Sequence, residues 1–139
     1  MPSIHLEYEV PEDDFARAGE ASADLKARLK KLGLPSDAVR RATIALYEGE
    51  INMAIHAKGG KIEVDVAPDQ VEMTLIDTGP GIPDIELAMR EGWSTASDEV
   101  RCLGFGAGMG LPNMKRHSDD FEISSEVGTG TRVFMRVVM

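Results

Sequence analysis

The sequence has one cysteine, Cys102, and few aromatic residues: one tryptophan, two tyrosines and four phenylalanines among 139 residues. A lone cysteine excludes a disulfide within the chain and a cysteine-based zinc site. Apolar runs stay far below the roughly 20 residues needed to span a bilayer. The acidic, alternating start MPSIHLEYEV is unlike a signal peptide. We therefore expect a single cytoplasmic domain covering residues 1–139.

Positive charge is also scarce, since 15 Lys and Arg residues face 24 Asp and Glu residues and the net charge is −9. This balance disfavours non-specific binding to nucleic acid or to an anionic membrane, and we expect neither as a partner. The charges are unevenly distributed: residues 7–24 carry seven acidic groups and one basic group, whereas residues 26–41 carry six basic groups and one acidic group. Solvated helix faces are one interpretation, and a docking surface for a protein partner is the other.

Hydrophobic periodicity predicts the fold class. Alternation of apolar and polar residues predicts strands over 4–10, 62–66, 71–76, 121–125 and 131–138. Helical spacing predicts helices over 12–32, 36–57, 84–91 and 109–117. Because successive strands read as hairpins, the expected fold is an α+β two-layer sandwich, with a mixed, mostly antiparallel sheet and helices on one face.

The second predicted helix carries the stretch YEGEINMAIHA, with Glu48, Asn52 and His56 spaced so that they share one face. Asparagine is unfavourable in the middle of a helix because its amide competes for backbone hydrogen bonds. A solvated polar face is one interpretation. The other is an oxygen-ligand site in which Asn52 binds Mg²⁺ and Glu48 acts as a base or a water-mediated ligand. The residues expected to face the core are Ile44, Ile51 and Ile55.

The stretch LIDTGPGIPD follows an apolar strand and places Asp77 before Gly79 and Gly81. An ionised carboxylate accepts hydrogen bonds and cannot donate them. Asp77 can therefore select adenine, which offers an amine, over guanine, which offers a carbonyl at the same place. The glycines would let the backbone approach a flat base. A simple turn is the alternative interpretation.

A third stretch, LGFGAGMGL, has a glycine at every second position from Gly104 to Gly110 and leads into the helix predicted at 109–117. Backbone N–H groups of glycine-rich turns hold phosphates, and a helix N-terminus favours anions. The run is not a Walker A motif, because no Gly-Lys-Ser/Thr follows it. It is also not a Rossmann fingerprint, because a long loop and not a strand precedes it.

Taken together and in order, E-x-x-x-N, D-x-G-x-G and G-x-G-x-G resemble the N, G1 and G2 boxes of the GHKL ATPase superfamily, whose ATP-binding domain is the Bergerat fold. A fourth element, GTGT at 128–131, matches the place of a family threonine near the adenine, here Thr131. The resemblance spans roughly residues 40–138. The stretches DTGPGIPDIELAMREGWST and GAGMGLPNMKRHSDDFEI narrow it to small bacterial anti-sigma-factor serine/threonine kinases, closest to the stress-signalling switch-kinase branch.

This resemblance implies a protein serine/threonine kinase that uses ATP and Mg²⁺. Glu48 would accept the proton of the substrate hydroxyl, Asn52 would hold Mg²⁺, and Asp77 would bind the adenine amine. The resemblance implies the following ATP-binding set: Asn52, His56, Asp77, Gly79, Gly81, Ile82, Gly104, Gly106, Gly108, Gly110, Leu111 and Thr131.

The partner implied by the resemblance is a small STAS-domain antagonist protein, with a sigma factor or another regulator as the alternative and a homodimer as a compatible state. Two other functions stay open at this point. The chain could be a nucleotide-gated binding module without phosphotransfer, or the stand-alone ATP-binding domain of a histidine kinase system. For the latter, the predicted strand position of His5 and the helix-end position of His117 are poor places for a phosphoacceptor.

Overall fold

A computed structural model describes residues 4–10, 19–56, 60–78 and 110–139. Its centre is a five-stranded sheet in the order β1-β2-β3-β5-β4, in which every described pair of strands is antiparallel. The strands are β1 (Ile4–Val10), β2 (Gly60–Ala67), β3 (Gln70–Ile76), β4 (Asp120–Glu126) and β5 (Gly130–Val138). Each of the five predicted strands is therefore present, and the α+β sandwich is confirmed.

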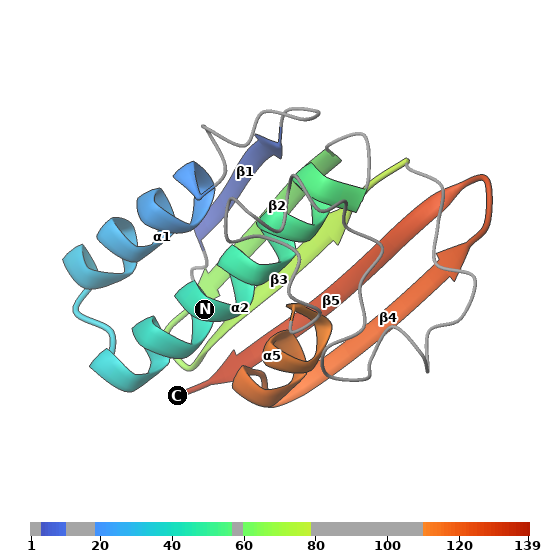
Figure 1. The fold of residues 1–139 in the computed structure, drawn as a ribbon. Coiled ribbons are helices and arrows are strands. Elements are labelled where there is room, and N and C mark those ends of the chain that lie inside the picture. Colours follow the sequence, from blue (N-terminus) through green and yellow to red (C-terminus); the bar gives the residue numbers. More distant parts are fainter. Residues whose placement is uncertain (1–3, 11–18, 57–59, 79–109) are drawn as a thin grey trace, which may run out of the picture.

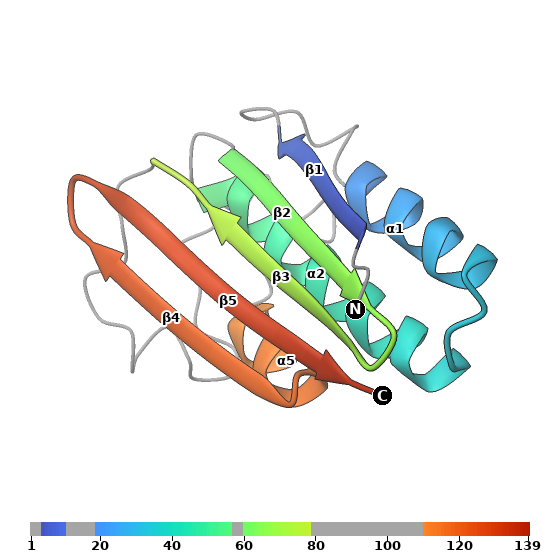
Figure 2. The same ribbon diagram turned by 180° about the vertical axis from the view of Figure 1, so that it is seen from behind.

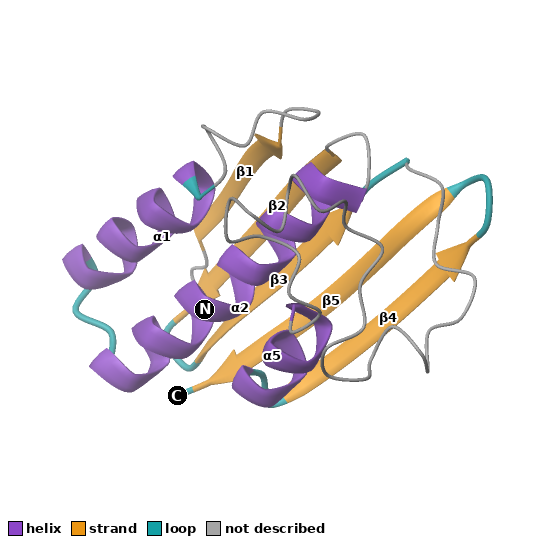
Figure 3. Ribbon diagram, in the orientation of Figure 1, coloured by secondary structure: helices purple, strands orange, loops and turns teal. Residues whose placement is uncertain are grey.

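The described helices are α1 (Glu20–Lys31), α2 (Ser36–His56) and α5 (Gly110–His117). All of them cover the same face of the sheet, with α1 and α5 on either side of α2 (Figure 1). Seen from behind, the described strands lie in front of these helices (Figure 2), and the two layers separate clearly when helices and strands are coloured apart (Figure 3). The first predicted helix is described only from Glu20 onward. The helix predicted over 84–91 lies outside the described residues.

The core lies between the two layers. Alternation places Val64, Met73 and Met135 on the covered face of neighbouring strands, and the side chains of all three are fully buried. Leu25, Leu29 and Leu46 of the helices pack against this face with no exposed area. Burial of each such side chain stabilises the fold by about 1.5–3 kcal/mol.

Small residues let α2 lie close to the sheet and to α5. Ala42 and Ala45 are fully buried, and a Cβ on Gly49 would lie 2.3 Å from Leu75 Cδ2 and 3.3 Å from Met114 Sδ. A glycine inside a helix costs about 1 kcal/mol relative to alanine. At position 49 the missing side chain allows close contact between α2, β3 and α5, directly beside Glu48, and this contact offsets the cost.

Helix α1 is held by a side chain of α2. Its N-cap residue, Gly19, supplies no side-chain hydrogen bond. Instead, the buried carboxylate of Glu50 accepts hydrogen bonds from the backbone N–H groups of Ala21 at 3.0 Å and Ser22 at 3.1 Å. The first turn of a helix has N–H groups without helical partners, and a carboxylate there also suits the helix dipole. Glu50 therefore fixes the start of α1 against α2.

None of the described helices is both long enough and apolar enough to cross a membrane.

Candidate nucleotide-binding and phosphoryl-transfer site

Asp77 follows the last residue of β3 and lies between two glycines of the neighbouring strands. A Cβ on Gly60, the first residue of β2, would lie 2.3 Å from the carbonyl oxygen of Ile76 and 3.1 Å from Asp77 Cα. A Cβ on Gly130, the first residue of β5, would lie 2.1 Å from the carbonyl oxygen of Asp77. Larger side chains at either position would displace the backbone that carries Asp77.

Asp77 and Thr131 form a reciprocal pair. The Asp77 N–H donates to the Thr131 carbonyl at 3.0 Å, and the Thr131 N–H donates to Asp77 Oδ1 at 3.2 Å. The Thr131 hydroxyl lies 2.9 Å from the Ser125 hydroxyl on β4. Both side chains of the pair are half-buried. The carboxylate of Asp77 is thus oriented by the backbone of β5, and the predicted adenine-binding pair lies at one end of adjacent strands.

Glu48 and Asn52 lie one helical turn apart on α2, and both are half-buried. Between them, Gly49 contacts the β3 side chain of Leu75. Met53 Cε lies 2.4 Å from where a Cβ on Gly60 would be. This part of α2 therefore crosses the end of β3 that leads to Asp77. The fold brings the predicted Mg²⁺ ligand and the predicted base to the same end of the sheet as the predicted adenine contact.

The helix after the glycine run completes the described part of the site. Gly110 is the first residue of α5, and Leu111 is buried. On the same helix, the Asn113 side-chain amide donates a hydrogen bond to Glu48 Oε1 at 3.2 Å. Arg116 Nη1 in turn donates to Asn113 Oδ1 at 3.1 Å. Sequence analysis did not single out Asn113, because its partner is 65 residues away and no local pattern marks the pair.

Several predicted site residues lie outside the described part of the chain: Gly79, Gly81, Ile82, Gly104, Gly106 and Gly108. The backbone of His56 ends α2, but its side chain also lies outside what the structure describes. The roles of these residues stay predictions from the sequence.

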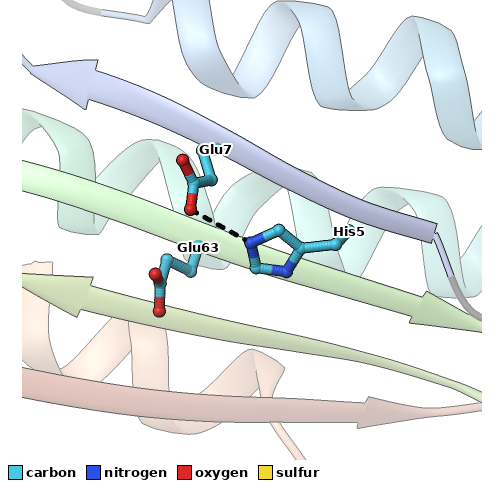
Figure 4. Close-up of side chains that lie close together, drawn as sticks. All are labelled: His5, Glu7 and Glu63. Carbon is cyan, nitrogen blue, oxygen red and sulfur yellow. Dashed lines mark hydrogen bonds and ion pairs between the residues drawn. The ribbon is translucent and has the colours of Figure 1, made fainter.

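A second polar cluster lies on the face of the sheet opposite the described helices, where the side chains of His5, Glu7 and Glu63 lie close together (Figure 4). Hydrogen bonds from His5 to Asp65 at 2.7 Å and to Glu7 at 3.2 Å raise the pKa of the imidazole. The ammonium of Lys61 lies 3.3 Å from a carboxylate oxygen of both Glu7 and Glu63. A lysine thus already occupies the place between the two glutamates that a bound cation would take.

The comparison with protein families shows to which family the chain belongs. Residues 37–139 match the model of the family described as Histidine kinase-, DNA gyrase B-, and HSP90-like ATPase. The chain belongs to this family. Membership confirms the predicted GHKL superfamily and supports the use of ATP at the site. The matched region contains each motif from Glu48 to Thr131 on which the prediction depended.

Two curated relatives show where the chain lies within the family. It is 34% identical over 108 residues to "Serine/threonine-protein kinase RsbT" of Bacillus subtilis strain 168, covering 75% of each chain. It is 30% identical, over an alignment of 140 positions, to "Anti-sigma F factor" of Clostridium beijerinckii. This alignment covers 96% of this chain and 91% of the relative. The predicted resemblance to anti-sigma-factor kinases is therefore confirmed.

Two solved structures have the same fold as this chain. The structure of the RsbU and RsbW domains of Rv1364c from Mycobacterium tuberculosis matches 99% of this chain with a TM-score of 0.63 and 16% sequence identity. The match covers 32% of that longer chain. The mycobacterial sensor histidine kinase MprB matches 97% of both chains with a TM-score of 0.53, also at 16% identity. At this level of identity, the likeness is one of fold alone.

Proposed function

We propose that this chain is a protein serine/threonine kinase of the anti-sigma-factor type, which transfers a phosphoryl group from Mg-ATP to a small regulatory protein. The observation that carries the proposal is the placement of Glu48. Its carboxylate is half-buried on α2, receives a hydrogen bond from α5, and lies one turn from Asn52 in an ATPase fold. A relative named as a serine/threonine kinase supports the same activity.

In this proposal the nucleotide lies between α2, α5 and the end of β3. Asp77 accepts a hydrogen bond from the adenine amine, and Thr131, which orients the Asp77 carboxylate, lies beside the base. Gly110 and Leu111 at the start of α5 belong to the phosphate-binding segment, because the first N–H groups of a helix favour anions. Residues 79–82, 104–108 and His56 complete the ATP-binding set.

Glu48 acts as the base. It accepts the proton of a serine or threonine hydroxyl while the hydroxyl oxygen forms a bond to the γ-phosphorus and the bond between that phosphorus and the bridging oxygen of ADP breaks. Asn52 and Glu48 offer an amide oxygen and a carboxylate on one face of α2, the type of ligand that Mg²⁺ takes. When bound, Mg²⁺ would neutralise charge on the phosphates, and Asn52 is the residue that would hold it.

We propose a small STAS-domain protein as the substrate, a sigma factor or another regulator as a second partner, and the cytoplasm as the location. Relatives named for anti-sigma activity support a regulatory protein partner. The net charge of −9 makes nucleic acid an unsuitable one. In this proposal residues 1–139 act as one ATPase domain.

The test is labelling of an extract from the organism that encodes the chain, using purified protein, Mg²⁺ and ATP labelled at the γ-phosphate. The proposal predicts one phosphoprotein whose label survives acid, as serine and threonine phosphates do. An acid-labile label would favour the histidine-kinase alternative. Tight ATP binding without any labelled protein would favour a nucleotide-gated binding module. Either of these results contradicts the proposal.

A further inference from the structure

We propose that Asn113 is a positioning residue for phosphoryl transfer, which orients the Glu48 carboxylate toward the substrate hydroxyl. This inference rests on the proposed kinase function and adds a residue that positions its base. Asn113 lies on α5, whereas Glu48 lies on α2, so the contact joins two separate helices of the site. Its Nδ2 donates to Glu48 Oε1 at 3.2 Å, and both side chains are half-buried.

The orientation of the Asn113 amide is determined by a third residue. An asparagine amide can be turned over in its place, which exchanges donor and acceptor. Here the Arg116 guanidinium donates to Asn113 Oδ1 at 3.1 Å. A guanidinium can only donate, so the oxygen of the amide must face Arg116 and its NH₂ group must face Glu48.

The chemistry of the pair suits a base. A hydrogen bond to Oε1 holds the carboxylate in one rotamer and leaves Oε2 to take the proton of the substrate hydroxyl. Because the amide is neutral, it orients Glu48 through a directional hydrogen bond and not through a full charge. Arg116 acts on Glu48 through Asn113 and supplies the orientation of the amide.

The packing beneath the pair holds the two helices at this distance. The residues that follow Glu48 and Asn113 in the sequence are Gly49 and Met114. Met114 is 1% exposed, and its Sδ lies 3.3 Å from where a Cβ on Gly49 would be. Two successive positions on α2 therefore contact two successive positions on α5, one contact polar and one apolar. Since α5 directly follows the glycine run, Asn113 also joins the phosphate-binding segment to the base.

The test compares Asn113→Ala with Lys115→Ala, an exposed position on the same helix. The assay uses the phosphoprotein identified by extract labelling as the substrate and Mg-ATP as the donor. We expect Asn113→Ala to lower kcat by about ten- to a hundredfold, the effect of one hydrogen bond to a charged group. The Kd for ATP and the KM for the protein substrate should stay within about twofold of wild type. Lys115→Ala should match wild type in all three.

A double-mutant cycle separates positioning from a structural role. Asn113→Ala is combined with Glu48→Gln, and residual transfer is measured over long incubations. Because Asn113 acts through the Glu48 carboxylate, its loss should have little further effect once that carboxylate is replaced. A structural role would instead add its full cost in both backgrounds and would weaken ATP binding.

The outcomes distinguish this inference from the function on which it rests. An active wild type, a strongly impaired Glu48→Gln variant and an unchanged Asn113→Ala variant overturn the inference alone. Additive effects of the two substitutions also overturn it alone. A wild type that binds ATP and labels no protein overturns the kinase proposal, and the role of Asn113 falls with it.

Discussion

The backbone N–H of Thr131 donates a hydrogen bond to Oδ1 of Asp77, and the Asp77 N–H donates to the Thr131 carbonyl in return. The two residues thus continue the pairing of β3 with β5 by one more step, with a side-chain oxygen as one acceptor. The predicted adenine-selecting carboxylate is held by backbone groups of the sheet. Changes to strand geometry at this end should therefore affect nucleotide binding and stability together.

Gly130→Ala tests this coupling directly. Its Cβ would lie 2.1 Å from the Asp77 carbonyl oxygen, at a φ of 140°. We expect a loss of about 2–4 kcal/mol in the free energy of unfolding, from the clash and the backbone strain. Gly128→Ala is the matched control, because its φ is 85° but nothing lies within 4 Å of its added Cβ. That variant should lose only about 1 kcal/mol. Urea unfolding and ATP titration of both variants measure the two effects. Equal losses of stability, or a loss of stability in Gly130→Ala without weaker ATP binding, would refute the coupling.

Asp77→Asn tests nucleotide selection with little damage to the fold. An asparagine keeps an oxygen that can accept the Thr131 N–H, so the melting temperature should change little. It replaces the other carboxylate oxygen with a donor, which cannot accept the adenine amine. We expect the Kd for ATP to rise by about tenfold or more and the preference for ATP over GTP to shrink. Calorimetric titration with both nucleotides checks this, and unchanged ATP affinity would remove Asp77 from the site.

Glu50→Ala tests the cap of α1. The variant leaves the N–H groups of Ala21 and Ser22 without their buried acceptor, so the free energy of unfolding should fall by about 1–3 kcal/mol. Residues two apart on a helix face different ways, so ATP affinity should persist in spite of the nearness of Glu48 in sequence. Chemical denaturation beside Lys26→Ala, an exposed position on α1, measures the effect. Equal stability of the two variants would argue against a capping role.

His5 predicts a pH dependence of stability. Its hydrogen bond to Asp65, and then that to Glu7, raise the pKa of His5 above 6.5 in the folded state. The stabilising contribution is therefore complete below the unfolded pKa and is lost as the pH rises through the folded one. The Glu7 pKa is lowered below 4.5, first by His5 and then by Lys61, so its contribution is lost at low pH.

Melting temperatures of wild type and His5→Gln check this dependence. The difference between the two proteins should be largest near about pH 5.5, where His5 is protonated and Glu7 ionised, and should shrink at about pH 8.5. His5, Glu7 and Asp65 are all exposed, so the effect of their hydrogen bonds on stability should also weaken in high salt. A difference that grows with pH would contradict the assigned partners of the imidazole.

Strong periodicity made much of the fold predictable. Alternation over residues 4–10 matches β1, and the predicted helix over 36–57 ends one residue from the observed one. The first strand of the central hairpin was predicted over 62–66 but begins at Gly60, which pairs with Val10 of β1. A glycine pair after a helix is typical of a helix end, and only the neighbouring strand shows that the second glycine also starts β2.

Side-chain packing was less predictable. Ile44 was expected to face the core and is only half-buried, whereas Ile51 is buried as expected. Helix α2 approaches the sheet through Ala42, Ala45 and Gly49, because close contact favours small residues over large apolar ones. The side chain of Ile55 lies outside the described part of the structure.

The candidate site also has a part that the sequence predicts and a part that it does not. Sequence motifs predict Glu48, Asn52, Asp77 and Thr131 as site residues by their type and order, since each has a local pattern around it. The contacts that orient these residues come from elsewhere in the chain. Asn113 reaches Glu48, and Gly130 makes room for Asp77, from positions more than 50 residues away. Such pairs depend on how helices and strands meet, which no local pattern contains.

The measurement that tests the central claim most directly is phosphoryl transfer by wild type and by Glu48→Gln, with the Kd for ATP determined for both. Transfer to the labelled partner should fall by about 10²–10⁴ in the variant, because the proton of the hydroxyl has lost its acceptor. ATP affinity should stay within about twofold. Transfer by the variant at the wild-type rate, or ATP binding by both proteins without any transfer, would contradict the account.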